Sequence, residues 1–216
     1  MLSKTEFHHI LDLLRGTVEP DPVLSEMKKF FLEEFGCEIY DCIVNEVPGS
    51  EKRLCYAVWD REDQESFFCH KENYYGCDEE KDQMIKEQFS SLCRMKNIHK
   101  GYWDPEDYFA VPVTIADELR TDIQHKAEAK IKRYLDSFLS IRRYAFQYDT
   151  VHIFYKTDED ILRHEEDGLS DKIRNRIFEF KKEYDEFSVL EDAGVVFSSL
   201  QTLNEKYNGN MFYYFK

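Results

Sequence analysis

Residues 37–59 read CEIYDCIVNEVPGSEKRLCYAVW, and this stretch decides the fold class. Its apolar residues gather in two runs, residues 37–47 and 54–59, and the polar stretch between the runs carries the turn signal Pro-Gly-Ser. Two strand-like runs joined by a short polar turn predict an antiparallel hairpin. The second run is apolar on both faces, so we expect that strand to lie inside the sheet.

Helices and further strands alternate along the rest of the chain. Apolar residues at helical spacing, preceded by capping residues such as Ser3 with Glu6, predict helices near residues 3–16, 21–36, 85–92, 114–138, 157–168, 170–184 and 202–207. Further strands are expected at residues 108–113, 150–156, 194–198 and 211–215. Pro112, near the end of the first of these, favours an edge position or a strand terminus. No internal repeat stands out. The pattern predicts a mixed α/β, or α+β, fold with one sheet of about five or six strands, an N-terminal antiparallel hairpin, and helices packed on at least one face.

The length and composition favour a single α/β domain over residues 1–216. Phe, Tyr and Trp make up 33 of the 216 residues, which supplies enough large apolar side chains for a core and argues against disorder. If the chain has a domain boundary, the loop at residues 97–107 is the expected place. The first residues lack the apolar run of a signal peptide, and no stretch approaches the roughly 18 apolar residues of a membrane span. We therefore expect a soluble, cytoplasmic protein that does not associate with membranes.

The charge of the chain limits its partners. The sequence has 44 Asp+Glu against 29 Lys+Arg, a formal net charge of −15. A surface of this sign repels nucleic acid and attracts basic proteins. We therefore expect a basic protein as the partner, and no nucleic acid; the oligomeric state is left open.

Two acidic segments, residues 60–82 and 158–171, are the candidate recognition surfaces. The first holds nine acidic residues interleaved with aromatic ones, and the second holds seven acidic residues. Aromatic anchors within a charged rim are typical of fast, tight protein interfaces. The predicted partner-binding residues are Phe67, Phe68, Tyr74, Tyr75, Asp78, Glu79, Glu80, Asp82, Asp158, Glu159 and Asp160. The alternative is that both segments are solvated faces that serve solubility.

The favoured function is therefore an acidic binding module that recognises a basic protein and neutralises it. In size, charge and aromatic content the chain is similar to small acidic immunity proteins, which block toxins in bacteria; no motif supports a closer resemblance. Two alternatives stay open. One is a hydrolase-type enzyme with dispersed residues, among them Asp41 and His152. The other is an assembly subunit that pairs through an aromatic strand at residues 211–215.

An enzyme is not favoured because no catalytic motif is present. The sequence has no nucleophile elbow, no glycine-rich phosphate loop and no HExxH motif, and no cofactor is expected. Alternation along residues 37–47 predicts that Asp41 faces water, and His152 is expected to be a hydrogen-bonded residue of a strand.

Metal sites are also weakly supported. Cys69-His70 with Cys77 is the nearest approach to a metal-ligand cluster, but reduced thiols are favoured, and no metal is expected. Magnesium nucleases set an Asp and a Glu-x-Lys at strand ends, and this chain has Asp149 and Glu179-Phe180-Lys181. Here the Glu-x-Lys lies on a predicted helix, which disfavours that comparison.

Overall fold

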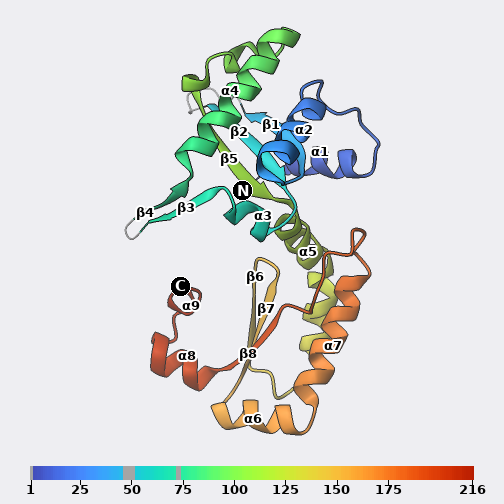
Figure 1. Ribbon diagram of the computed structural model, residues 1–216. Helices are drawn as coiled ribbons and strands as arrows, with labels where there is room; N and C mark the ends of the chain where they lie inside the picture. Colours follow the sequence, from blue (N-terminus) through green and yellow to red (C-terminus); the bar gives the residue numbers. More distant parts are fainter. Residues whose placement is uncertain (1, 46–51, 72–73) are drawn as a thin grey trace. The chain divides into compact units, whose positions relative to one another are not determined.

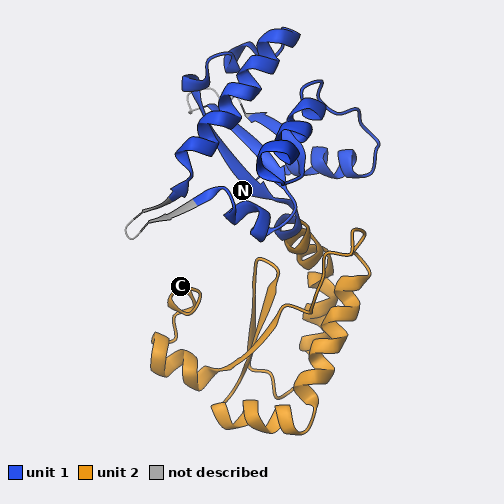
Figure 2. Cartoon of the chain, viewed as in Figure 1, with its two compact units in different colours: residues 1–118 blue, residues 119–216 orange. Residues whose placement is uncertain are grey.

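The computed structural model describes residues 2–45, 52–71 and 74–216; of residues 45, 69–71, 74 and 75 it describes the backbone alone. The chain divides into two compact units, Met1–Glu118 and Leu119–Lys216 (Figure 2). Each unit has its own three-stranded sheet. The sequence favoured a single domain and gave the loop at residues 97–107 as the place of a boundary if one exists; that loop lies within unit 1.

Unit 1 is built on a sheet with the strand order β1-β2-β5 (Figure 1). Strands β1 and β2 pair antiparallel, which confirms the predicted hairpin, and β2 is the central strand, as its apolar sequence predicted. Strand β5, which contains Pro112, runs parallel to β2 at an edge, as expected. The elements are α1 (Lys4–Leu14), α2 (Leu24–Phe35), β1 (Ile39–Asn45), β2 (Lys52–Val58), α3 (Arg61–Glu65), β3 (Phe68–Lys71), β4 (Tyr74–Cys77), α4 (Glu79–Lys96), η1 (Lys100–Tyr102), η2 (Pro105–Asp107) and β5 (Tyr108–Thr114).

The core of unit 1 forms between this sheet and the helices α2 and α4. Helix α2 contributes Leu24, Met27 and Phe31 at helical spacing, and α4 contributes Ile85 and Phe89. Alternate residues of β2 face these helices: Leu54, Tyr56 and Val58. Each such side chain removed from water stabilises the fold by roughly 1.5–3 kcal/mol before the entropy of ordering the chain is subtracted.

Unit 2 repeats this arrangement with shorter strands. Its sheet has the order β6-β7-β8, with β6 and β7 antiparallel and β8 parallel to β7. Helices α5 and α7 supply Ala127, Ile131, Leu135, Ile173 and Ile177 to the core on one face. The elements are α5 (Ile115–Leu135), which begins in unit 1, β6 (Arg143–Gln147), β7 (Thr150–Tyr155), α6 (Asp158–Glu166), α7 (Leu169–Lys182), β8 (Val195–Ser199), α8 (Leu200–Tyr207) and α9 (Met211–Tyr214).

The two units therefore share one topology: an antiparallel hairpin, a helical crossover, and a third strand parallel to the second. The sequence shows no matching repeat. The topology can recur without one because a buried strand requires apolar residues in alternation or in runs, and many different sequences meet that requirement.

Two parts of the predicted fold are wrong in detail. The class, mixed α and β, is confirmed, but in the described residues the strands form two separate three-stranded sheets and the short β3–β4 hairpin, not one sheet of five or six strands. The expected strand at residues 211–215 is instead the short helix α9. Asn210 caps α9 by accepting a hydrogen bond from the Phe212 amide, and the Tyr214 ring packs on Phe154 of β7. The alternative of an assembly subunit required a strand at residues 211–215, and the structure has none there.

Candidate functional site

The negative charge of the chain belongs almost entirely to unit 1. Residues 1–118 contain 13 Lys+Arg against 26 Asp+Glu, a net charge of −13, whereas residues 119–216 contain 16 against 18, a net charge of −2. In unit 2 the acidic residues 158–171 are balanced by the basic residues of α5 and α7. A field that attracts a cationic partner is therefore a property of unit 1.

Two acidic elements of unit 1 are brought together by the β3–β4 hairpin. The short helix α3 is capped by Asp60, whose carboxylate accepts hydrogen bonds from the Glu62 and Asp63 amides. Helix α4 is capped in the same way by Asp78. Because the hairpin returns the chain, the Asp78 amide donates to the Phe67 carbonyl at 2.9 Å, so α4 begins beside the end of α3.

Both elements are fixed to the edge strand β5. The Gln64 side chain of α3 donates to the Pro112 carbonyl at 3.1 Å, and the Asp82 carboxylate of α4 accepts from the Ala110 amide at 3.2 Å. These bonds occupy backbone groups that an edge strand leaves without a strand partner. We call the resulting surface the acidic edge. It consists of Asp60, Glu62, Asp63, Glu65, Asp78, Glu79, Glu80 and Asp82.

The structure divides the predicted residues of the acidic edge by role. Asp78 is a helix cap, and Asp82 lies 3.0 Å from the Lys86 ammonium while holding the Ala110 amide. Glu79 and Glu80 are exposed in the first turn of α4. The side chains of Tyr74 and Tyr75 lie outside the described residues, and Phe68 is half-buried on β3.

Phe67 is a core residue, which corrects the expectation of an exposed anchor at this position. Its side chain is 2% exposed, and its ring centroid lies 5.1 Å from that of Tyr56, 5.4 Å from Phe35 and 5.7 Å from Phe31. Successive side chains along extended backbone point to opposite sides. When one side of Phe67–Phe68 faces the core, only one of the two rings can point toward it. That alternation is the signal in the sequence that could have separated them.

The acidic residues predicted in unit 2 hold α6 in place. The Asp158 carboxylate accepts hydrogen bonds from the Ser199 and Thr202 hydroxyls, and these bonds lower the pKa of Asp158. Asp160 forms a capping box with Thr157 at the start of α6. Of the three predicted residues Glu159 is exposed and has no such structural bond in the described part of the chain.

Asp41, one candidate of the enzyme alternative, is buried and does not face water. Tyr40 is an extra residue in the β1–β2 pairing, and this bulge re-aims the next side chain, which simple alternation could not predict. Asp41 is 1% exposed; its Oδ1 accepts from the Cys42 amide, and its Oδ2 lies 3.7 Å from His9 Nε2. Burial raises the pKa of this carboxyl group.

His152, the other candidate, is a strand residue with a hydrogen bond, as expected. Its Nδ1 lies 3.3 Å from the Tyr214 hydroxyl, and its ring packs edge-on against Tyr214 and Phe215. Burial lowers the pKa of His152. Asp41 belongs to unit 1 and His152 to unit 2, so neither unit by itself contains both.

The cysteine side chains that the structure describes form no metal centre. Cys37, Cys42, Cys55 and Cys93 are free and buried, and burial raises the pKa of Cys37 and Cys93 to about 12. Within the described residues, no group of three or more His, Cys, Asp or Glu side chains is arranged to hold a metal ion. The side chains of Cys69 and His70, the pair named with Cys77 from the sequence, lie outside the described residues.

Comparison of the chain with protein-family models, with curated proteins and with solved structures gave no match. Among the helices of the described ranges, none combines the length and the apolar character that crossing a membrane requires.

Proposed function

We propose that the protein binds a basic protein through the acidic edge of unit 1. The observation that carries the proposal is the convergence of α3 and the first turn of α4 on strand β5, in the unit that bears a net charge of −13. Carboxylates about 20 positions apart in sequence thereby belong to one surface. On this proposal the cationic site of the partner is covered, and the partner is neutralised.

Two cations near the acidic edge whose side chains the structure describes, Arg61 and Lys81, are already engaged. Arg61 lies 3.5 Å from the Asp117 carboxylate, and the Lys81 ammonium donates to the Ser66 carbonyl and lies over the Phe67 ring. Glu79 and Glu80 are exposed in the described structure. Their carboxylates are available to a cationic partner, and a surface of this kind contributes mainly to the rate of association.

The binding energy must have a second source. Exposed ion pairs contribute only about 0–1 kcal/mol each, so carboxylates by themselves give fast but weak association. The proposal therefore requires apolar contacts within the same surface, and half-buried Phe68 is the described candidate.

The test is affinity capture from an extract of the source organism with three forms of the protein as bait. Glu79→Lys combined with Glu80→Lys reverses the two exposed carboxylates in the first turn of α4 and leaves the Asp78 cap intact. The matched control is Glu165→Lys combined with Glu166→Lys, which makes the same change of charge on the exposed surface of α6 in unit 2.

We expect the wild type and the unit 2 control to capture a basic protein that salt releases, and the Glu79/Glu80 variant to lose it. The association rate of the purified pair should fall at least about tenfold in the Glu79/Glu80 variant, because steering by charge acts on this rate. Equal capture by all three baits, or capture of proteins that are not basic, would refute the proposal.

A further inference from the structure

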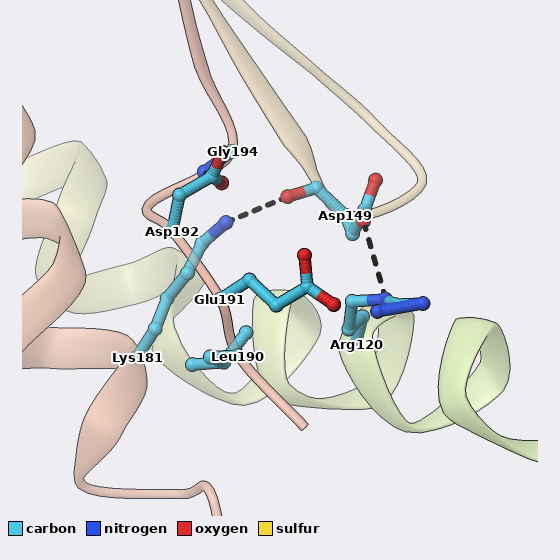
Figure 3. A pocket seen from close by; sticks show the side chains of 7 residues that line it. All are labelled: Arg120, Asp149, Lys181, Leu190, Glu191, Asp192 and Gly194. Atoms are coloured by element: carbon cyan, nitrogen blue, oxygen red, sulfur yellow. Dashed lines mark hydrogen bonds and ion pairs between the residues drawn. The ribbon is translucent and has the colours of Figure 1, made fainter. Parts of the chain in front are cut away.

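Lys181 is a buried lysine in the last turn of α7. Its side chain is 1% exposed, and its Nζ donates to the Asp149 carbonyl at 2.6 Å (Figure 3). The same Nζ donates to the Ala193 carbonyl at 2.7 Å. Asp149 belongs to the turn between β6 and β7, and Ala193 precedes β8. The amine therefore joins the starts of two neighbouring strands.

The charge of a lysine in this place is poorly compensated. Within the described residues, Lys181 Nζ makes two hydrogen bonds, both to backbone carbonyls. No described carboxylate oxygen lies within ion-pair distance of it. The nearby carboxylates have other partners: that of Asp192 accepts from the Gly194 amide, and that of Asp149 lies 3.9 Å from Arg120. Buried charges in proteins are normally paired, because an unpaired one is costly.

The two carbonyls suit a neutral amine better than an ammonium. A neutral amine has two N–H bonds and one lone pair, whereas an ammonium has three N–H bonds. The two carbonyls therefore satisfy both N–H donors of the neutral amine, and its lone pair remains available. The pKa of Lys181 agrees with this geometry. Burial lowers it and the charges of Asp149 and Asp192 raise it, but burial has the larger effect and the resulting pKa is about 8.

Lys181 lines a cavity of about 200 Å³. The same cavity is lined by Arg120, whose guanidinium supplies a positive charge, and by Glu191, whose exposed carboxylate reaches into the cavity near Arg120 (Figure 3). A small molecule in this space would meet an amine, a cation suited to binding a carboxylate, and an acid–base group.

We propose that Lys181 is a reactive amine that forms a Schiff base with a small carbonyl compound bearing a carboxylate, such as a 2-oxo acid. The nitrogen lone pair attacks the carbonyl carbon, forming a C–N bond, and one of the two amine protons moves to the carbonyl oxygen. The resulting hydroxyl group leaves together with the second amine proton as water, and the C=N bond remains. No oxidant or reductant takes part.

Each neighbouring group has a role in this step. Arg120 would bind the carboxylate of the compound in a bidentate manner and so place its carbonyl carbon toward Lys181. The Glu191 carboxylate would take a proton from the attacking amine and return it to the departing hydroxyl group. The Asp149 and Ala193 carbonyls position the amine, because they hold its two N–H bonds.

The test is reductive trapping with glyoxylate and cyanoborohydride at about pH 7, followed by peptide mass spectrometry of the full chain. Lys182 is an internal control, because it is the next residue, is exposed and pairs with Asp185 at 2.9 Å. We expect Lys181 to be labelled at least about tenfold faster than Lys182, since an amine of pKa about 8 is far more often unprotonated at this pH than an ordinary lysine. Acetaldehyde, which lacks a carboxylate, should show a smaller preference for Lys181.

Two variants sharpen the result. Arg120→Gln should remove the preference for glyoxylate over acetaldehyde while leaving Lys181 reactive. Lys181→Met should remove the fast label, and Lys182→Met should not. If Lys182 and the surface lysines of the folded wild type are labelled first, and Lys181 is labelled only after denaturation, the proposal is wrong; this outcome needs no variant to fold.

Discussion

Gly194 offers the sharpest test of the packing around Lys181. Its φ is +55°, and a Cβ added there would lie 2.6 Å from the Asp149 carbonyl oxygen and 3.2 Å from Lys181 Nζ. In Gly194→Ala the carbonyl of Asp149 must move, which weakens its bond from Lys181. The left-handed backbone costs about 1 kcal/mol for alanine, and a buried donor without its acceptor costs about 1–3 kcal/mol more.

Gly168 provides the matched control in the same unit. Its φ is +77°, but an added Cβ would meet nothing within 4 Å, so Gly168→Ala carries the backbone cost alone. We expect Gly194→Ala to lower the free energy of unfolding of unit 2 by about 2 kcal/mol more than Gly168→Ala. Native-state hydrogen exchange at the Val151 amide, which donates to the Gly194 carbonyl, measures this as roughly 30-fold faster exchange. Equal effects of the two substitutions, within about 0.5 kcal/mol, would refute the reasoning.

Three further predictions concern buried side chains. Phe67→Ala should lower the free energy of unfolding of unit 1 by about 3–5 kcal/mol and Phe68→Ala by about 1 kcal/mol, measured by urea titration with tryptophan fluorescence, because both tryptophans lie in unit 1. A loss below about 1 kcal/mol for Phe67→Ala would contradict its place in the core. The pKa of Lys181 is lowered from 10.5 to about 8, so the unfolded chain binds more protons between these pH values and the stability of unit 2 should rise with pH across them, by up to about 3 kcal/mol. Urea titrations by circular dichroism at about pH 8 and about pH 10 should show this rise in the wild type relative to Lys181→Met; parallel curves for the two proteins would argue against it. Because burial raises the pKa of Asp41, the stability that the protonated carboxyl group provides at low pH is lost as the pH rises through that pKa. Asp41→Asn should therefore stabilise unit 1 by about 1 kcal/mol at neutral pH and by less near pH 3.8. The same fluorescence titration measures this difference. A destabilised Asp41→Asn at neutral pH would show instead that the carboxylate is stabilising.

The fold was predictable where local rules determine it. The hairpin of β1 and β2, the central place of β2 and the edge place of β5 all follow from apolar runs and from Pro112. The capping box of Ser3 with Glu6 is present as predicted. The run of aromatic residues at 211–215 misled, because the half-buried Tyr214 ring packs against strand β7 and does not belong to a strand itself.

The candidate sites were less accessible to sequence reasoning, because they depend on contacts between distant residues. The acidic edge is assembled through the bonds of Gln64 and Asp82 to strand β5, whose bonded residues follow them by 48 and 28 positions. The concentration of charge in unit 1 required knowing where the chain divides. The sequence placed Lys181 on a helix, correctly, but only the carbonyls of Asp149 and Ala193 show that its amine is buried.

The shared topology of the two units has a consequence for how the chain folds. Each hairpin joins strands that are near in sequence, and such pairs form within microseconds. The third strand, β5 or β8, must close a connection of about 40 to 50 residues before it can pair, so it is added late. Until then β2 and β7 each have one edge without a strand partner, and each of these edges accepts a strand in the parallel direction. The shared topology would therefore permit β5 and β8 to exchange between the two hairpins when the whole chain refolds at once, whereas synthesis from the N-terminus completes unit 1 before β7 and β8 are made.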